Sequence, residues 1–179
     1  MRDEVSSEMR ARLISNRNGK LTVDQWKDMV TEPLTILLLL LAPLVIVMGP
    51  RLAAFSIRGW IIVLLVGTTL LSVPLIFRAW RYARAAIHFE KLYAGDHPSP
   101  AVLFWRPCVL YTDKGTEVRF TKRLAPVVAL RPNHAYIVYY LRDSGQHVLL
   151  SLAPAEHPDA ERWQPSPAFH ERFARRTDR

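Results

Sequence analysis

The side chains that could do chemistry in this sequence are scattered, and their spacing indicates no metal or catalytic site. Such sites draw on histidine, cysteine and carboxylate side chains at characteristic separations. No histidine pairs with a cysteine or carboxylate at metal-ligand spacing; the six are His88, His97, His134, His147, His157 and His170. His88 and Glu90 lie two positions apart, and on a helix such residues face different ways. We therefore predict no metal, no cofactor and no enzymatic activity.

Motifs for nucleotide binding and hydrolysis are also missing from the sequence. There is no P-loop, no glycine fingerprint for dinucleotides and no Gly-x-Ser-x-Gly, and the single Cys108 has no recognisable base. Three tyrosines, Tyr136, Tyr139 and Tyr140, could stack on bases beside Arg142, but aromatic residues at this spacing are typical of a protein core. We predict no nucleic-acid partner.

Two apolar runs between Pro33 and Phe77 indicate how the chain is organised. The first covers Leu34 to Met48 and the second Trp60 to Phe77, with Gly49-Pro50-Arg51 as a helix break between them. About 20 apolar residues cross the hydrocarbon core of a bilayer as a helix. The pattern predicts a two-span transmembrane helical hairpin, with spans at about 30–49 and 59–77. A buried helical hairpin of a soluble protein is the alternative.

Basic residues near the spans predict an orientation for this hairpin. The connecting loop has Arg51 and Arg58, whereas seven basic side chains flank the outer ends of the two spans: Arg17, Lys20, Lys27, Arg78, Arg81, Arg84 and Lys91. Lysine and arginine accumulate on the cytoplasmic side of membrane proteins. The sequence thus predicts an integral membrane protein with both termini on the cytoplasmic, inner side.

Two sets of residues are the candidate contact sites. Lipid or partner contact is predicted for the basic and tryptophan side chains near the expected membrane surface, namely Arg78, Arg81, Arg84, Trp80 and Trp26. The arginines could instead serve only as a topology anchor. Close helix packing in the membrane is predicted at the small residues Gly67, Thr68 and Ser72.

Helical patterns flank the hairpin on both sides. Residues 1–32 are expected to form amphipathic helices on the membrane surface, with Val5, Met9 and Leu13 as one apolar stripe. Thr22 and Gln25 match a capping box at a helix start. Residues 78–95 contain no glycine or proline before Gly95, so we expect the second span to continue there as a basic juxtamembrane helix.

The pattern changes to short extended runs over residues 96–153. Six runs are expected as strands, at 101–105, 108–112, 117–121, 127–130, 135–141 and 147–152. Asp113-Lys-Gly115 and Asp143-Ser-Gly145 predict hairpins, and Arg131-Pro-Asn-His134 predicts a turn. A small antiparallel sandwich or partly open barrel is therefore expected. Residues 154–179 read as a Pro-rich tail whose short C-terminal helix begins at Pro167, with Ser166 as its cap.

The predicted fold class is an α+β membrane protein, in which the second span extends beyond the membrane and a small antiparallel β domain follows. The order of hairpin, helix and β domain resembles that of small bacterial membrane proteins with a pleckstrin-homology-like cytoplasmic domain, although no motif matches and no functional residue is carried over. The predicted function is a non-catalytic accessory, scaffold or assembly subunit of a larger membrane protein complex, with other membrane protein subunits and anionic lipid headgroups as partners. The alternative is a membrane-tethered lipid-sensing or regulatory module.

Overall fold

The described part of the chain contains a closed β-barrel with helices against it. The computed structural model describes residues 5–30, 67, 69, 72–73, 75–82, 85–95, 108–126, 128, 130–143 and 146–177. The chain divides into two compact units, one made of Met1–Gln25 with Ala85–Arg179 and the other of Trp26–Arg84. The barrel belongs to the first unit.

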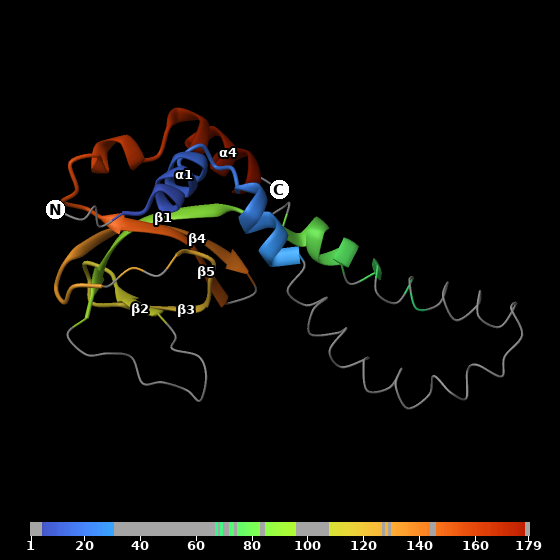
Figure 1. Cartoon of the computed structure of the whole chain (residues 1–179), viewed down its shortest axis with the longest axis horizontal. Coiled ribbons are helices and arrows are strands. Elements are labelled where there is room, and N and C mark those ends of the chain that lie inside the picture. The colour runs from blue at the N-terminus through green and yellow to red at the C-terminus, as the bar shows by residue number, and fades with distance from the viewer. Residues whose placement is uncertain are drawn as a thin grey trace, which may run out of the picture. The chain divides into compact units, whose positions relative to one another are not determined.

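Five strands form the barrel: β1 (Ile87–Ala94), β2 (Cys108–Tyr111), β3 (Glu117–Arg123), β4 (Ala135–Asp143) and β5 (Gln146–Pro154). Around the barrel the order is β1-β2-β3-β5-β4, and β4 pairs with β1 to close it (Figure 1). The neighbouring order β4-β1-β2-β3 is a Greek key. All pairs are antiparallel except β3 with β5, which is parallel.

The strand alternation predicted at residues 117–121 is confirmed. In β3, Val118 and Phe120 are buried, whereas Glu117, Arg119 and Thr121 are exposed. Side chains in a strand point alternately to opposite faces, so the apolar pair faces the barrel interior and the polar residues face outward. The interior is completed by residues such as Leu92, Leu110 and Leu149, all fully buried.

The first strand is where the structure departs furthest from the sequence pattern. Residues 78–95 were expected to continue one helix, and this prediction is wrong, because residues 75–82 are helical but Ile87–Ala94 form β1. Seven residue pairs join β1 to β4, from Ile87 opposite Leu141 to Tyr93 opposite Ala135. The absence of glycine and proline permits a helix without requiring one, and pairing with β4 decides the outcome.

The predicted two-span hairpin, and with it the class of α+β membrane protein, is also wrong. Within the described residues, no helix combines the length and the apolar character needed to span a bilayer. Much of the expected hairpin, residues 31–66, lies outside the described residues. The predicted membrane localisation, with both termini on the inner side, is wrong for the same reason. The β domain is a closed barrel rather than a sandwich or a partly open barrel.

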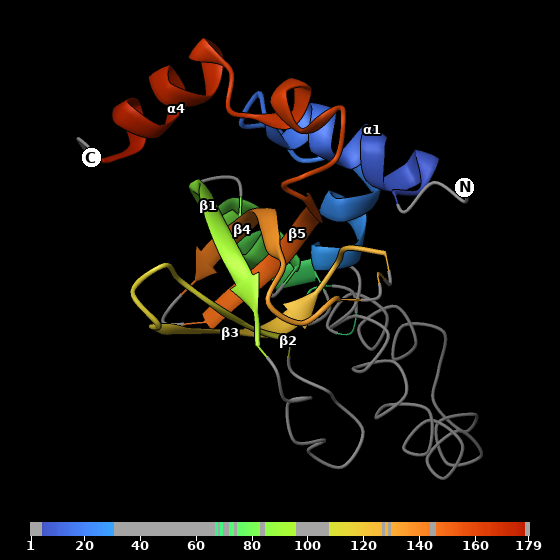
Figure 2. The same ribbon diagram turned by 90° about the vertical axis from the view of Figure 1, so that its left-hand side faces the viewer.

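Helix α1 (Ser7–Asn16) covers the barrel at β5. Its apolar stripe of Val5, Met9 and Leu13 is buried, and α1 contacts β5 and η1. Figures 1 and 2 show α1 and α4 on one side of the barrel, with β2 and β3 forming the opposite side. The stripe that the sequence predicts therefore lies on the sheet.

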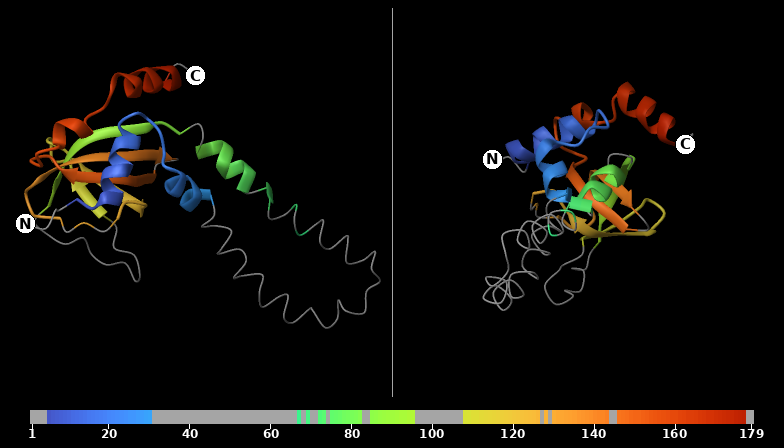
Figure 3. Two further views of the ribbon diagram at one scale, coloured as in Figure 1. Left: turned by 45° about the horizontal axis from the view of Figure 1, so that its top comes forward. Right: turned by 90° about the vertical axis from the view of Figure 1, so that its right-hand side faces the viewer.

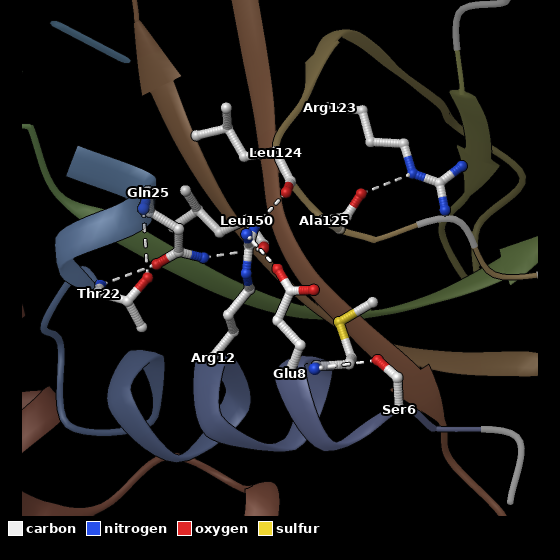
Figure 4. Close-up of polar contacts among 10 residues, drawn as sticks. Ser6, Glu8, Arg12, Thr22, Gln25, Arg123, Leu124, Ala125 and Leu150 are labelled. Atoms are coloured by element: carbon white, nitrogen blue, oxygen red, sulfur yellow. Dashed lines mark hydrogen bonds and ion pairs between the residues drawn. The ribbon is translucent and has the colours of Figure 1, made fainter. Parts of the chain in front are cut away.

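Polar contacts bind α1 to β5 and to the residue that follows β3. The Asn16 amide donates to the Ser151 hydroxyl at 2.8 Å, and both residues are fully buried. Arg12 donates to the Leu124 carbonyl and pairs with Glu8 at 2.6 Å (Figure 4). Because unpaired buried polar groups are costly, these bonds fix the position of the helix as well as its orientation.

The predicted capping box is confirmed at the start of the next helical segment, residues 23–30. The backbone N–H of Thr22 donates to Gln25 Oε1 at 3.0 Å, and the N–H of Gln25 donates to the Thr22 hydroxyl at 3.3 Å. In addition, Gln25 Nε2 donates to the Leu150 carbonyl at 2.9 Å (Figure 4). Leu150 is the residue skipped where the β4–β5 register shifts, so the capping residue satisfies a carbonyl at a β-bulge.

The C-terminal residues cover the barrel surface over β4. A 3-10 helix, η1 (Ala160–Trp163), precedes α4 (Pro167–Thr177), and the predicted start at Pro167 is confirmed (Figure 3). The Ser166 hydroxyl donates to the Arg17 carbonyl at 3.0 Å and to Asn18 Oδ1 at 2.8 Å. Phe169 is buried, with its ring 6.0 Å from that of Tyr139, whose hydroxyl donates to the Trp163 carbonyl at 2.6 Å. The tail therefore covers the outer face of β4.

Candidate functional site

Four rings from four strands meet at one end of the barrel, and we call them the ring cluster: His88 (β1), Phe120 (β3), Tyr140 (β4) and His147 (β5). The Tyr140 ring stacks on His88 at a centroid distance of 5.4 Å and meets the edge of His147 at 5.3 Å. Phe120 lies 5.7 Å from Tyr140 and 6.1 Å from His147. Tyr140 is therefore the centre of the cluster.

Strand register explains why these rings converge. His88 is directly opposite Tyr140 in the β1–β4 ladder, and Phe120 is opposite His147 in the parallel β3–β5 ladder. Alternation along β4 directs Tyr139 outward to Phe169 of α4 and Tyr140 toward the inward-facing Phe120. The cluster thus joins both the closing strand pair and the parallel strand pair of the barrel.

One carboxylate is bonded to the cluster. The Tyr140 hydroxyl donates to Glu90 Oε2 at 3.1 Å. Burial, followed by the charge of Glu90 and this hydrogen bond, raises the pKa of Tyr140 far above its ordinary value, and Arg142 opposes the rise only in part. Tyr140 is therefore a neutral hydrogen-bond donor over the physiological pH range.

The position of His88 disfavours its protonated form. Burial lowers the pKa of His88 below 6.5, and the positive charges of Arg142 and His147 lower it further, while Glu90 alone acts in the other direction. Arg142 is exposed and stands opposite His147 in the β4–β5 ladder. At neutral pH the cluster is therefore built around an uncharged His88.

The described residues otherwise bring few chemically active groups together. Within them, no group of three or more His, Cys, Asp and Glu side chains is arranged to hold a metal ion. Cys108 is half-buried on β2, and burial raises the pKa of its thiol, so the thiol stays protonated. The ring cluster combines contacts among four strands with a histidine whose protonated form is disfavoured.

The contact residues predicted from sequence are placed in part. Arg78 is half-buried and Arg81 exposed on the helical segment 75–82, whereas Arg84 and Thr68 lie outside the described residues. Trp26 and Ser72 are half-buried. Among the described residues, nothing lies within 4 Å of a Cβ added at Gly67. The predicted helix-packing role of Gly67, Thr68 and Ser72 therefore stays a prediction.

A second feature is an apolar stripe on the helical residues 72–73 and 75–82. Its members are Val73 (59 % exposed), Ile76 (67 %), Phe77 (59 %) and Trp80 (53 %), which we call the 73–80 stripe. The rings of Phe77 and Trp80 lie 6.4 Å apart. The sequence places Ile76 and Trp80 on one apolar stripe of the second predicted span and its extension, whereas it does not single out Val73 and Phe77.

The ring cluster was not predicted from the sequence, because His88 and Glu90 were expected on a helix. In β1 they lie on one face of a strand, with Phe89 and Lys91 on the other. Residues 88–93 read His-Phe-Glu-Lys-Leu-Tyr, which shows no regular apolar–polar alternation that would have marked a strand. Comparison of the chain with protein-family models, with curated proteins and with solved structures finds no match. The function has to be argued from these two features, since a barrel fold alone does not specify one.

Proposed function

We propose that the protein is a non-catalytic accessory or assembly subunit of a larger protein complex and that the 73–80 stripe is its contact surface for a partner subunit. The observation that carries this proposal is the exposure of four large apolar side chains on one helical segment. Single exposed apolar residues are common on proteins, but a contiguous apolar set is typical of an interaction surface.

The spacing of the stripe supports this proposal. Positions 73, 76, 77 and 80 are separated by three, one and three residues, which places them on one side of a helix. Tryptophan and other aromatic residues are enriched where interfaces concentrate their binding energy. The neighbouring Arg81 is exposed and basic, so the matching partner surface is an apolar groove with an acidic rim.

A matched pair of substitutions tests the proposal. The full chain carries an affinity tag in its own host cells, and Ile76→Glu is compared with the same substitution at Ile14, an exposed apolar residue of α1. A stoichiometric partner should co-purify with the wild type and with Ile14→Glu. Affinity of the purified partner for Ile76→Glu should fall at least about tenfold, which corresponds to about 1.4 kcal/mol.

Two results would contradict this function. The first is a wild-type protein that purifies under mild conditions without any stoichiometric partner. The second is a partner that binds Ile76→Glu as tightly as it binds the wild type, with circular dichroism showing that both chains are folded.

Binding to anionic lipid headgroups through the basic side chains is the second candidate, and the exposure of Arg81 favours it. Each basic residue near an anionic surface contributes about 1 kcal/mol at most, and salt weakens the attraction. Binding of the full chain to vesicles with and without anionic lipid distinguishes the two candidates. Salt-sensitive binding that Arg78→Gln with Arg81→Gln abolishes and Ile76→Glu retains would favour lipid over a protein partner.

A further inference from the structure

We propose that the ring cluster is a proton-operated latch, which holds one end of the barrel closed while His88 is neutral and loosens that end when His88 is protonated. The inference is independent of the proposed partner surface. It rests on where the rings lie, what they join and which charges face them.

The rings of the latch make contacts among four strands: β1, β3, β4 and β5. Tyr140 contacts His88 across the closing β1–β4 pair, and it contacts His147 and Phe120, which face each other across the parallel β3–β5 pair. These contacts lie at the end of the β1–β4 ladder where Ile87 is opposite Leu141. The other end of β4, where Ile137 is opposite Ala153 of β5, contains no member of the cluster.

The charges around His88 make its protonation unfavourable. The charges that act on His88 come from Arg142 of β4, His147 of β5 and Glu90 of β1, and its ring stacks on that of the neutral Tyr140. On β3 the contribution to the cluster is the apolar Phe120, while the Thr121 hydroxyl donates to the His147 carbonyl at 3.5 Å. Protonation of His88 adds a positive charge whose interaction with Arg142 is unfavourable, and Glu90 is already bonded to Tyr140.

The direction of the pH effect follows from linkage. Because the pKa of His88 is lower in the folded barrel than its ordinary value of 6.5, the opened state binds more protons than the closed state. The closed end is therefore fully stable above about pH 6.5 and loses stability as the pH falls through the folded-state pKa. The latch is closed at neutral pH and loosens in mildly acidic solution.

Site-resolved amide hydrogen exchange on the full chain tests the latch, with both ends of β4 measured in one sample. Between pH 7 and pH 5, after correction for intrinsic exchange, protection at Tyr140, Leu141 and Val148 should fall several-fold. Protection at Ile137 and Ala153 should change much less. His88→Phe with His147→Phe keeps a ring at each position but removes both imidazoles, so the difference between the two ends should disappear.

Further variants test whether the pH effect comes from His88 rather than from another histidine or from misfolding. His170→Gln removes an exposed histidine of α4 and should behave like the wild type. If the double phenylalanine variant fails to fold, His88→Gln alone should reduce the pH effect, and a nuclear magnetic resonance titration should place the His88 pKa below 6.5. A His88 pKa at or above 6.5, or equal loss of protection at both ends of β4 in the wild type, would overturn the proposal.

Discussion

At the scale of single residues, Gln25 shows how one side chain joins local and tertiary structure. It completes the capping box with Thr22, and its amide donates to the Leu150 carbonyl of β5. Glutamate also serves at this position of a capping box. Here glutamate would retain an acceptor for Thr22 but lose the donor for Leu150, and Gln25 is fully buried. Its tertiary contact therefore selects the amide over the carboxylate.

Gln25→Glu is expected to lower the free energy of unfolding by about 3 kcal/mol at pH 7, because it buries a carboxylate against a carbonyl oxygen. Burial raises the pKa of the introduced carboxyl, so the deficit should shrink as the pH falls and the protonated carboxyl donates to Leu150 again. Urea unfolding at pH 7 and at pH 4 measures both values. The same substitution at the exposed Gln164 should change stability by less than about 0.5 kcal/mol. A deficit that does not vary with pH would contradict this account.

At the scale of elements, hydrophobic pattern and turn residues identified most of the barrel strands. The runs at 108–112, 117–121, 135–141 and 147–152 correspond to β2, β3, β4 and β5, and the turns at Gly115 and Asn133 have the positive φ angles that such turns use. The expected strand at 101–105 lies outside the described residues, and residues 128 and 130 are not in a strand.

Strand β1 could not be identified in the same way, because no turn residue separates it from the helical residues before it. Its sequence fits a helix locally, and the β1–β4 pairing that makes it a strand joins positions about fifty residues apart. The parallel β3–β5 pair is likewise non-local, and no hairpin signal marks it. The ring cluster depends on both pairings, so it could not be derived before the topology was known.

Leu92→Ala tests the assignment of residues 87–94 to the barrel. The Leu92 side chain is fully buried, so its truncation should lower the free energy of unfolding by about 3 kcal/mol. Lys91 is the next residue and points outward, so Lys91→Ala should change it by less than about 0.5 kcal/mol. Chemical denaturation of both variants gives the comparison. Equal effects of the two substitutions would contradict the alternation of β1.

At the scale of the whole molecule, the buried tyrosines set an alkaline limit to stability. Burial raises the pKa of both Tyr139 and Tyr140 well above the ordinary value of 10, and each hydroxyl donates a hydrogen bond, to the Trp163 carbonyl and to Glu90 respectively. Tyr139 thus binds the C-terminal segment, and Tyr140 belongs to the ring cluster. Ionisation of tyrosine at high pH therefore weakens two parts of the barrel unit, the C-terminal segment outside the barrel and the ring cluster inside it.

The expected result is that stability falls above about pH 10, because the unfolded tyrosines lose their protons there while the folded ones keep them. The folded state binds more protons, so the free energy of unfolding is fully present below the unfolded pKa and decreases as the pH rises beyond it. Tyrosinate absorbance should show that at least two of the six tyrosines ionise only together with unfolding, as followed by far-ultraviolet circular dichroism. Tyr140→Phe removes one of these titrating groups, so its stability should decline less steeply above pH 10. Ionisation of all six tyrosines in a chain that stays folded would show that these hydroxyls are not buried as described.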